Sequence, residues 1–311
     1  MYHRVLDTEN GHVAFQQPGI TVSKKSFTAQ MEFLKANFET LSMSQLADAL
    51  ERGLPCEQKA VLVTFDDGWK DNFTNAYPVL KRLGIPSAIF LTTGFIDTNR
   101  RFWQSRLIDL LKASREHLGK DVGYRRELVG RKEAKEVLPI LMSRDENGFN
   151  ESISVLMTNR KKRGAKDIEE WLGALRTALG IDSEDVGRTP EFLSWEEVRT
   201  MSKDAVEFGS HGVTHQILPQ KKEIATSEIA DSKKTIEDKL RVEVKAFSYP
   251  NGEYDEEILR VVKKGGYAIA FGTEPGPILS GSHQFALPRV NIHEDMTSSI
   301  PMFLGRIAGL W

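Results

Sequence analysis

The chain has 311 residues, of which 40% are hydrophobic and 28% are charged, and its formal net charge is −2. This composition excludes a disordered or fibrous protein, and the near-zero charge excludes a general attraction to nucleic acid or to an anionic membrane. No apolar run approaches the roughly 20 residues of a membrane-spanning helix. Cys56 is the single cysteine, so internal disulfides and a thiolate metal cage are excluded, and any metal must bind to histidine and carboxylate ligands.

The chain begins MYHRVLDTENG, without the basic stretch and apolar core of a secretory signal. The sequence as written therefore predicts a cytoplasmic protein. The opening MYHRV also reads like the end of a buried strand, so a start upstream of residue 1 would leave the compartment open.

Predicted strands and helices alternate along much of the chain. Short apolar runs that are typical of strands buried on both faces lie at 60–65, 87–91, 205–210, 246–250 and 267–271. Helical patterns lie at 26–53 (as a pair), from residue 69 to about Gly84, at 195–202 and at 221–240. A further one carries Ile258, Leu259, Val261 and Val262 and ends at Gly265. Repeated βα units predict an α/β fold with a parallel sheet or a (β/α) barrel, in which chemistry takes place at the C-terminal ends of the strands.

Serine residues mark the expected starts of several helices. Ser26 is expected to open the first helix of the early pair, and Ser42 or Ser44 the second. Ser194 with Glu197 predicts a capping box for the helix at 195–202.

The segment at about 98–190 interrupts this alternation and is expected to be a mostly helical insertion. Residues 100–166 contain 17 Lys and Arg against 9 Asp and Glu, a local charge of +8. One interpretation is a solvated helical cap. The other is that the RKKR run at 160–163 and nearby arginines attract an anionic ligand or surface.

Two polar motifs follow predicted strands. Asp66, Asp67 and Gly68 come directly after the strand at 60–65, where one carboxylate could bind metal while the other faces substrate, or where the three residues could simply form a turn. His211 and His215, four residues apart, come directly after another strand. If the two motifs meet at one barrel mouth, two imidazoles and a carboxylate make a hydrolytic zinc site.

Three motifs in order resemble those of the polysaccharide deacetylases of carbohydrate esterase family four, the NodB-homology proteins. They are TFDDG at 64–68, SHGVTH at 210–215 and FSYPNG at 247–252. The resemblance covers roughly 60–95 and 190–292. It implies a distorted (β/α) barrel of the NodB-homology type.

The same resemblance sets the expected domain organisation. Residues 1–311 are expected to form a single deacetylase domain that contains the helical insertion. The opening MYHRV resembles a subgroup in which a motif that is usually C-terminal stands at the N-terminus.

Roles for the acidic and histidine motifs are implied by the resemblance. Asp66 corresponds to the catalytic base, and Asp67, His211 and His215 correspond to the metal ligands, with zinc expected and cobalt or nickel also compatible with these ligands. Position 212 is Gly where the family has Ser or Thr, so a supporting hydrogen bond is expected to be absent.

The oxyanion and arginine positions are implied less directly. FSYPNG resembles the family's R-x-P-Y-G segment, which assigns the amide of Asn251 to the oxyanion. Ser248 stands where the family has the arginine that orients the base, and Arg289 is the candidate substitute, against the alternative of an ordinary ion-pair arginine.

The general acid has two candidates. His293 lies in NIH, where the family has Leu-x-His, and His3 lies in the opening MYH, which fits the permuted subgroup better. His3 is favoured, against an alternative in which it only caps a strand. The family's DxxDW-type motif has no obvious counterpart.

The expected function is therefore removal of N-acetyl groups from N-acetylhexosamine units of a polysaccharide or glycan precursor. Two alternatives are a deformylase or deacylase of a lipid-linked amino sugar, and an inactive glycan-binding homologue. No dinucleotide fingerprint is present, and nucleic-acid binding is not expected because the basic excess lacks interleaved aromatic residues.

Overall fold

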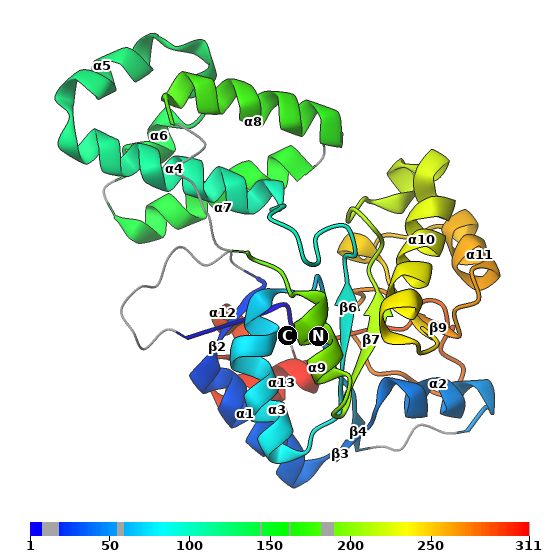
Figure 1. The fold of residues 1–311 in the computed structure, drawn as a ribbon. Coiled ribbons are helices and arrows are strands. Elements are labelled where there is room, and N and C mark those ends of the chain that lie inside the picture. The colour runs from blue at the N-terminus through cyan, green and yellow to red at the C-terminus, as the bar shows by residue number, and fades with distance from the viewer. Residues whose placement is uncertain (8–18, 55–58, 144, 162, 182–189, 311) are drawn as a thin grey trace. The chain divides into compact units, whose positions relative to one another are not determined.

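A computed structural model describes the chain at residues 1–7, 19–54, 59–143, 145–161, 163–181 and 190–310 (Figure 1). The described residues divide into two compact units. The described residues within Asn99–Thr189 form the second unit, and the first unit takes in the remaining ones. The motifs TFDDG (64–68), SHGVTH (210–215) and FSYPNG (247–252) belong to the first unit. The description as one domain with an insertion stays a prediction.

A five-stranded parallel sheet forms the centre of the first unit. Its strands, in spatial order, are β5 (Val63–Phe65), β6 (Ser87–Leu91), β7 (Val206–Ser210), β8 (Ala246–Ser248) and β9 (Ile269–Phe271). All their residues are buried except Glu207, which is partly exposed. A parallel sheet covered on both faces explains why the strands read as continuous apolar runs rather than as alternating ones.

Main-chain contacts beyond these strands close the sheet into a ring. They are the parallel bridges of Phe271 with Leu287 and of Tyr2 with Phe65, and the hydrogen bond from the Ile292 amide to the Met1 carbonyl (2.9 Å). The segment after β9 therefore pairs with β9 on one side and with the N-terminal residues on the other, and these pair with β5. This irregular closure confirms the predicted distorted (β/α) barrel.

Two short parallel pairs lie outside the central sheet. They are β1 (Arg4–Leu6) with β2 (Thr21–Ser23), and β3 (Glu39–Thr40) with β4 (Ala60–Val61). The prediction of a single strand at 60–65 was wrong in this respect. The chain forms two strands there, β4 and β5, which pair with different partners on either side of Leu62.

Helices alternate with the strands. In the first unit they are α1 (Lys24–Asn37), α2 (Met43–Glu51), α3 (Tyr77–Leu83) after a π-helical turn (Asn72–Ala76), α9 (Trp195–Met201), α10 (Lys222–Leu240), α11 (Glu256–Lys264), α12 (Glu294–Thr297) and α13 (Ile300–Ile307). No helix in the described ranges is both long and apolar enough to cross a membrane.

The caps agree with the sequence at two helices and differ at one. Capping boxes begin α2 at Ser42 and α9 at Ser194. The prediction that Ser26 opens the first helix was wrong, because Ser23 is the N-cap of α1 and its hydroxyl accepts from the Ser26 amide (3.0 Å). The helix therefore begins one turn earlier.

The second unit is helical and has its own apolar core. Its helices are α4 (Trp103–Lys120), α5 (Val122–Gly130), α6 (Leu138–Leu141), α7 (Glu146–Lys161) and α8 (Ala165–Leu179). Buried leucine, isoleucine and phenylalanine side chains from these helices pack together. Burying such a set is a sufficient reason for this polar stretch to be compact.

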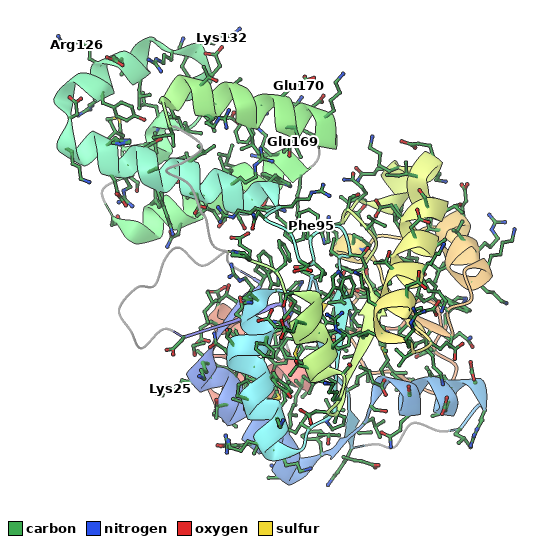
Figure 2. All side chains as sticks on the ribbon, viewed as in Figure 1. Lys25, Phe95, Arg126, Lys132, Glu169 and Glu170 are labelled. Atoms are coloured by element: carbon green, nitrogen blue, oxygen red, sulfur yellow. The ribbon has the colours of Figure 1, made fainter. Side chains whose placement is uncertain are left out.

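Basic side chains of the second unit are interspersed with acidic ones. Arg126 and Lys132 point outward (Figure 2), but Arg106 forms an ion pair with Glu169 (2.7 Å). Arg160, the first residue of the RKKR run, forms an ion pair with Glu136 within the same unit. An anionic ligand for this segment stays a prediction that these contacts do not favour.

Candidate active site and metal centre

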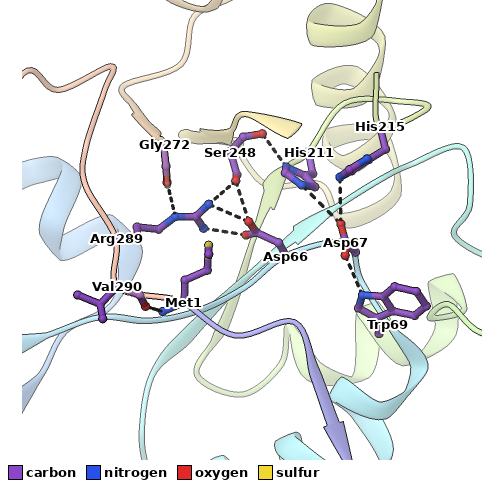
Figure 3. A network of polar contacts seen from close by, with 10 residues as sticks. All are labelled: Met1, Asp66, Asp67, Trp69, His211, His215, Ser248, Gly272, Arg289 and Val290. Atoms are coloured by element: carbon purple, nitrogen blue, oxygen red, sulfur yellow. Dashed lines mark hydrogen bonds and ion pairs between the residues drawn. The ribbon is translucent and has the colours of Figure 1, made fainter. Parts of the chain in front are cut away.

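The polar motifs come together at the C-terminal ends of the central strands (Figure 3). Asp66 and Asp67 follow β5, His211 and His215 follow β7, and Ser248 ends β8. Asp67 has a left-handed backbone (φ 77°), which costs a non-glycine residue about 1–2 kcal/mol. The two carboxylates point in different directions, so that Asp66 faces an arginine and Asp67 faces the histidines.

Asp67, His211 and His215 form a cluster with the geometry of a metal site. The Oδ1 atom of Asp67 lies 3.5 Å from Nε2 of His211 and 3.4 Å from Nε2 of His215. This oxygen is buried and has no hydrogen-bond partner in the described part of the chain. The other carboxylate oxygen, Oδ2, accepts from the indole Nε1 of Trp69 (2.8 Å). One oxygen is therefore held by the protein, and the other faces both imidazoles.

The hydrogen-bonding state of His211 fits that of a metal ligand. Its Nδ1 lies 2.7 Å from the Ser248 carbonyl oxygen, which can only accept, so Nδ1 carries the proton and Nε2 presents a lone pair. Burial, the largest cause, lowers the pKa of His211 to about 4, so the ring is neutral at pH 7. A lone pair of nitrogen and a carboxylate oxygen thus face each other without a proton between them. A divalent cation with two nitrogen ligands and one oxygen ligand fits this arrangement.

Asp66 belongs to a separate buried network. Arg289 donates from Nη1 and Nη2 to its two carboxylate oxygens (2.7 and 2.8 Å) and from Nε to the Gly272 carbonyl (2.9 Å). The Ser248 hydroxyl accepts from Arg289 (2.8 Å) and donates to Asp66 (3.1 Å). Burial by itself would raise the pKa of Asp66, but the guanidinium, helped by His211, holds that pKa well below its usual range. Asp66 is therefore ionised at neutral pH.

His3 lies within electrostatic reach of both carboxylates. The Asn72 side chain donates to its main-chain carbonyl (2.7 Å), and its Nδ1 atom is buried without a hydrogen-bond partner among the described residues. Burial is the main cause that lowers the pKa of His3, whereas the charges of Asp67 and Asp66 act to raise it. The Asp66 amide donates to the Tyr2 carbonyl (3.0 Å), so His3 directly follows a residue that is paired with Asp66.

His293 lies in a different setting. It is the N-cap residue of α12, and its Nδ1 atom lies 3.1 Å from Oδ2 of Asp295. No described contact joins it to the two-aspartate site. Of the two candidate acids, only His3 directly follows a residue whose main chain is paired with Asp66 in the described part of the chain.

Asn251 lies in the short turn Pro250–Gly252, directly after β8. Its backbone is left-handed (φ 57°). This turn stands at the same end of the sheet as Ser248, so the amide of Asn251 is on the side where the carboxylates lie. Its contact with an oxyanion stays a prediction.

Sequence reasoning missed Trp69, which holds the metal-facing aspartate. Its ring is stacked on Phe192 (centroids 4.8 Å apart), and the Arg4 guanidinium lies 4.4 Å from the ring centroid. Arg4 in turn donates to Asp71 (2.9 Å). The signal that could have found Trp69 is its place two residues after Asp67, where an indole N–H can reach the carboxylate.

Comparisons with known proteins agree with the fold and the motifs. The sequence profile of the family described as polysaccharide deacetylase matches residues 54–141 and 154–270. The Bacillus subtilis protein YxkH is 25% identical over 285 residues, which cover 90% of this chain and 68% of YxkH. A Staphylococcus aureus poly-beta-1,6-N-acetyl-D-glucosamine N-deacetylase is 21% identical over 302 residues, covering 94% of this chain and 78% of that protein. The structure of the Streptococcus pyogenes deacetylase PplD in complex with acetate superposes with a TM-score of 0.62 at 18% identity, covering 99% and 96% of the two chains.

Proposed function

This chain belongs to the polysaccharide deacetylase family of hydrolases, and on that basis we propose that it is a metal-dependent N-deacetylase. Its substrate would be the N-acetylhexosamine units of a polysaccharide or a glycan precursor. The observation that carries the proposal is the pairing of two neighbouring carboxylates with different tasks. Asp67 faces two imidazoles, and Asp66 is held ionised by Arg289. The S. aureus relative, named for N-deacetylation of a glucosamine polymer, supports this substrate class.

Five residues share the work of the proposed reaction. A divalent cation held by Asp67, His211 and His215 would supply a Lewis acid that polarises the amide carbonyl and lowers the pKa of a water molecule. Asp66 accepts a proton from that water on a carboxylate oxygen as the water attacks the carbonyl carbon. As the C–N bond breaks, the imidazole of His3 would give a proton to the amine nitrogen, so it must carry that proton at this step although burial lowers its pKa. The products are acetate and a free amino sugar.

The oxyanion needs a donor besides the cation. The amide of Asn251 is the proposed donor, since it follows β8 at the end of the sheet where the carboxylates lie. We infer zinc as the cation because two imidazoles and one carboxylate, with further positions left for water and substrate, are typical of hydrolytic zinc sites. Cobalt and nickel accept the same ligands.

The alternatives use the same residues. A deformylase or deacylase of a lipid-linked amino sugar would need only a different acyl group at this site. An inactive glycan-binding homologue was suggested by the absence of arginine at position 248. The bidentate ion pair of Arg289 with Asp66 weakens that suggestion, since a guanidinium reaches the carboxylate from a different segment.

Metal removal tests the proposed function directly. We expect the protein to contain about one zinc per chain and to release acetate from N-acetylglucosamine oligomers. Treatment with a chelator should abolish release, and added zinc should restore it. Circular dichroism before and after chelation serves as the control for folding. A protein that binds metal but releases neither acetate nor formate from any acylated amino sugar would support the binding-protein alternative.

Replacement of each candidate acid tests the role of His3. His3→Gln should lower kcat by about 10²–10⁴-fold on acetamide substrates, because the amine would leave without its proton donor. His293→Gln is the matched control and should stay near wild-type activity. Steady-state acetate release measures both, and thermal unfolding checks that both variants fold. If His293→Gln is the inactive variant, the acid lies at that position instead.

A further inference from the structure

The loop between the two histidines has an unusual backbone. Gly212 (φ 81°) and His215 (φ 59°) both lie in the left-handed region. The Thr93 amide donates to the Gly212 carbonyl (3.1 Å), and the Gly94 amide donates to the Val213 carbonyl (2.8 Å). These bonds fix the carbonyls of the loop, so its amides must find acceptors elsewhere.

A single buried carboxylate supplies those acceptors. Glu228 comes from α10 and is only 5% exposed. Its Oε2 accepts from the amides of Val213 (2.7 Å) and Thr214 (2.9 Å), and its Oε1 accepts from the Thr214 hydroxyl. Burying a carboxylate is costly unless donors surround it, so this arrangement is stable only when the loop holds its three donors in place. The loop and Glu228 therefore constrain each other.

The same carboxylate explains the glycine at position 212. A Cβ atom built on Gly212 would lie 2.9 Å from Oε2 of Glu228, which is closer than real Cβ contacts. A serine or threonine there would need the space that the carboxylate occupies. Glycine at position 212 has no side chain to support the loop, but Glu228 accepts three hydrogen bonds from it.

We propose that Glu228 is a positioning residue of the metal centre, which takes over from a side chain at position 212 the task of fixing the loop that carries His211 and His215. The inference rests on the proposed function, since it assumes that the two histidines are metal ligands. The Glu228 carboxylate contacts neither imidazole. It acts through the main chain between them and so sets how the two Nε2 atoms stand relative to Asp67.

Metal affinity of Glu228→Gln tests this role. Glutamine keeps the size of the side chain, but its NH₂ group would face a donor of the loop. We expect zinc to bind about 10–100-fold more weakly, measured by titrating the metal-free protein against a chromophoric chelator. The kcat per bound zinc at saturating zinc should change much less. Glu237→Gln is the matched control, because Glu237 lies on the same helix and bonds to the Val244 amide and Lys233, and its zinc affinity should be unchanged.

A second variant covers the case in which Glu228→Gln does not fold. Thr214→Val removes only the hydroxyl donor and keeps the shape of the side chain, so a smaller loss of zinc affinity is expected. If wild type binds zinc and either folded variant binds it within twofold of wild type while only its thermal stability falls, Glu228 has a purely structural role. If wild type binds no zinc at all, the proposed function fails instead.

A double-mutant cycle isolates the clash at position 212. Gly212→Ser in the wild-type background combines left-handed strain with the contact to Glu228, whereas in a Glu228→Ala background only the strain remains. We expect the loss of zinc affinity caused by Gly212→Ser to be at least about fivefold smaller in the second background. If Gly212→Ser lowers zinc affinity equally in the two backgrounds, Glu228 does not take the place of a side chain at position 212.

Discussion

Asp66→Asn should abolish acetate release while the protein keeps its metal. Asparagine is nearly the same size and can still accept from Arg289, but its amide cannot take a proton from water. The loss in kcat should therefore reach about 10²–10⁴-fold or more. Zinc content should be unchanged, because the metal-facing group is Asp67 and not Asp66. Acetate release and zinc content measured on the same preparation check both parts.

The neighbouring carboxylate supplies the control. Asp67→Asn is the same substitution at the next residue. This variant should lose both its zinc and its activity. The contrast between the two variants separates the task of the base from that of the ligand. Loss of zinc in Asp66→Asn, or acetate release within tenfold of wild type, would contradict the assignment of Asp66 as the base.

Arg289→Gln should shift the pH dependence of the reaction and destabilise the fold. In the wild type, burial favours the neutral form of Asp66, and the guanidinium overcomes it to hold the pKa below its usual range. Without the guanidinium, burial is left largely unopposed and the pKa of Asp66 rises. The acidic limb of the kcat/KM profile should then move to higher pH, with activity recovering as pH increases. Unchanged profiles would show that Arg289 does not control the charge of Asp66.

The stability effect of Arg289→Gln should also depend on pH. Removing one partner of a buried ion pair typically costs about 3–5 kcal/mol. Because the folded pKa of Asp66 is depressed, the pair stabilises the fold fully above the unfolded pKa of about 3.9, and this contribution is lost as pH falls towards the folded value. The difference in unfolding free energy between wild type and variant should therefore be largest above the raised pKa that Asp66 has in the folded variant, and should shrink as pH falls below it. Denaturant unfolding at several pH values measures it.

A surface ion pair provides the matched control for that measurement. Arg82 pairs with Glu32 at 3.0 Å, and both side chains are about half exposed. Arg82→Gln should cost less than about 1 kcal/mol at pH 7, because exposed pairs contribute little. Equal losses from Arg82→Gln and Arg289→Gln would contradict the importance of burial for the Asp66 pair.

Local patterns were enough to predict much of the fold. Continuous apolar runs predicted the central strands, since a parallel strand covered on both faces needs apolar side chains along its whole length. The capping box at Ser194 depends on a contact three residues apart, so it is visible in the sequence, whereas the sequence left Ser42 and Ser44 as alternatives for the start of α2. The split between β4 and β5 was not visible, because one apolar run can pair with two different partners when the barrel curves.

The candidate site shows the same difference between local sequence patterns and contacts made only in the folded chain. The sequence by itself determined the candidate residues, since Asp66, Asp67, His211 and His215 follow strands whose C-terminal ends must meet at one edge of a parallel sheet. It also pointed to Arg289 as a candidate, but offered an ordinary ion pair as the alternative.

Only the tertiary structure decided how those residues are held. Asp66 meets Arg289 across 223 positions of sequence and meets Ser248 across 182, and Glu228 reaches the histidine loop from a separate helix. A side chain that supports another from so far along the chain leaves no periodicity or fixed spacing. Its contribution appears only when the closed barrel brings the segments together and burial makes each unpaired donor or acceptor costly.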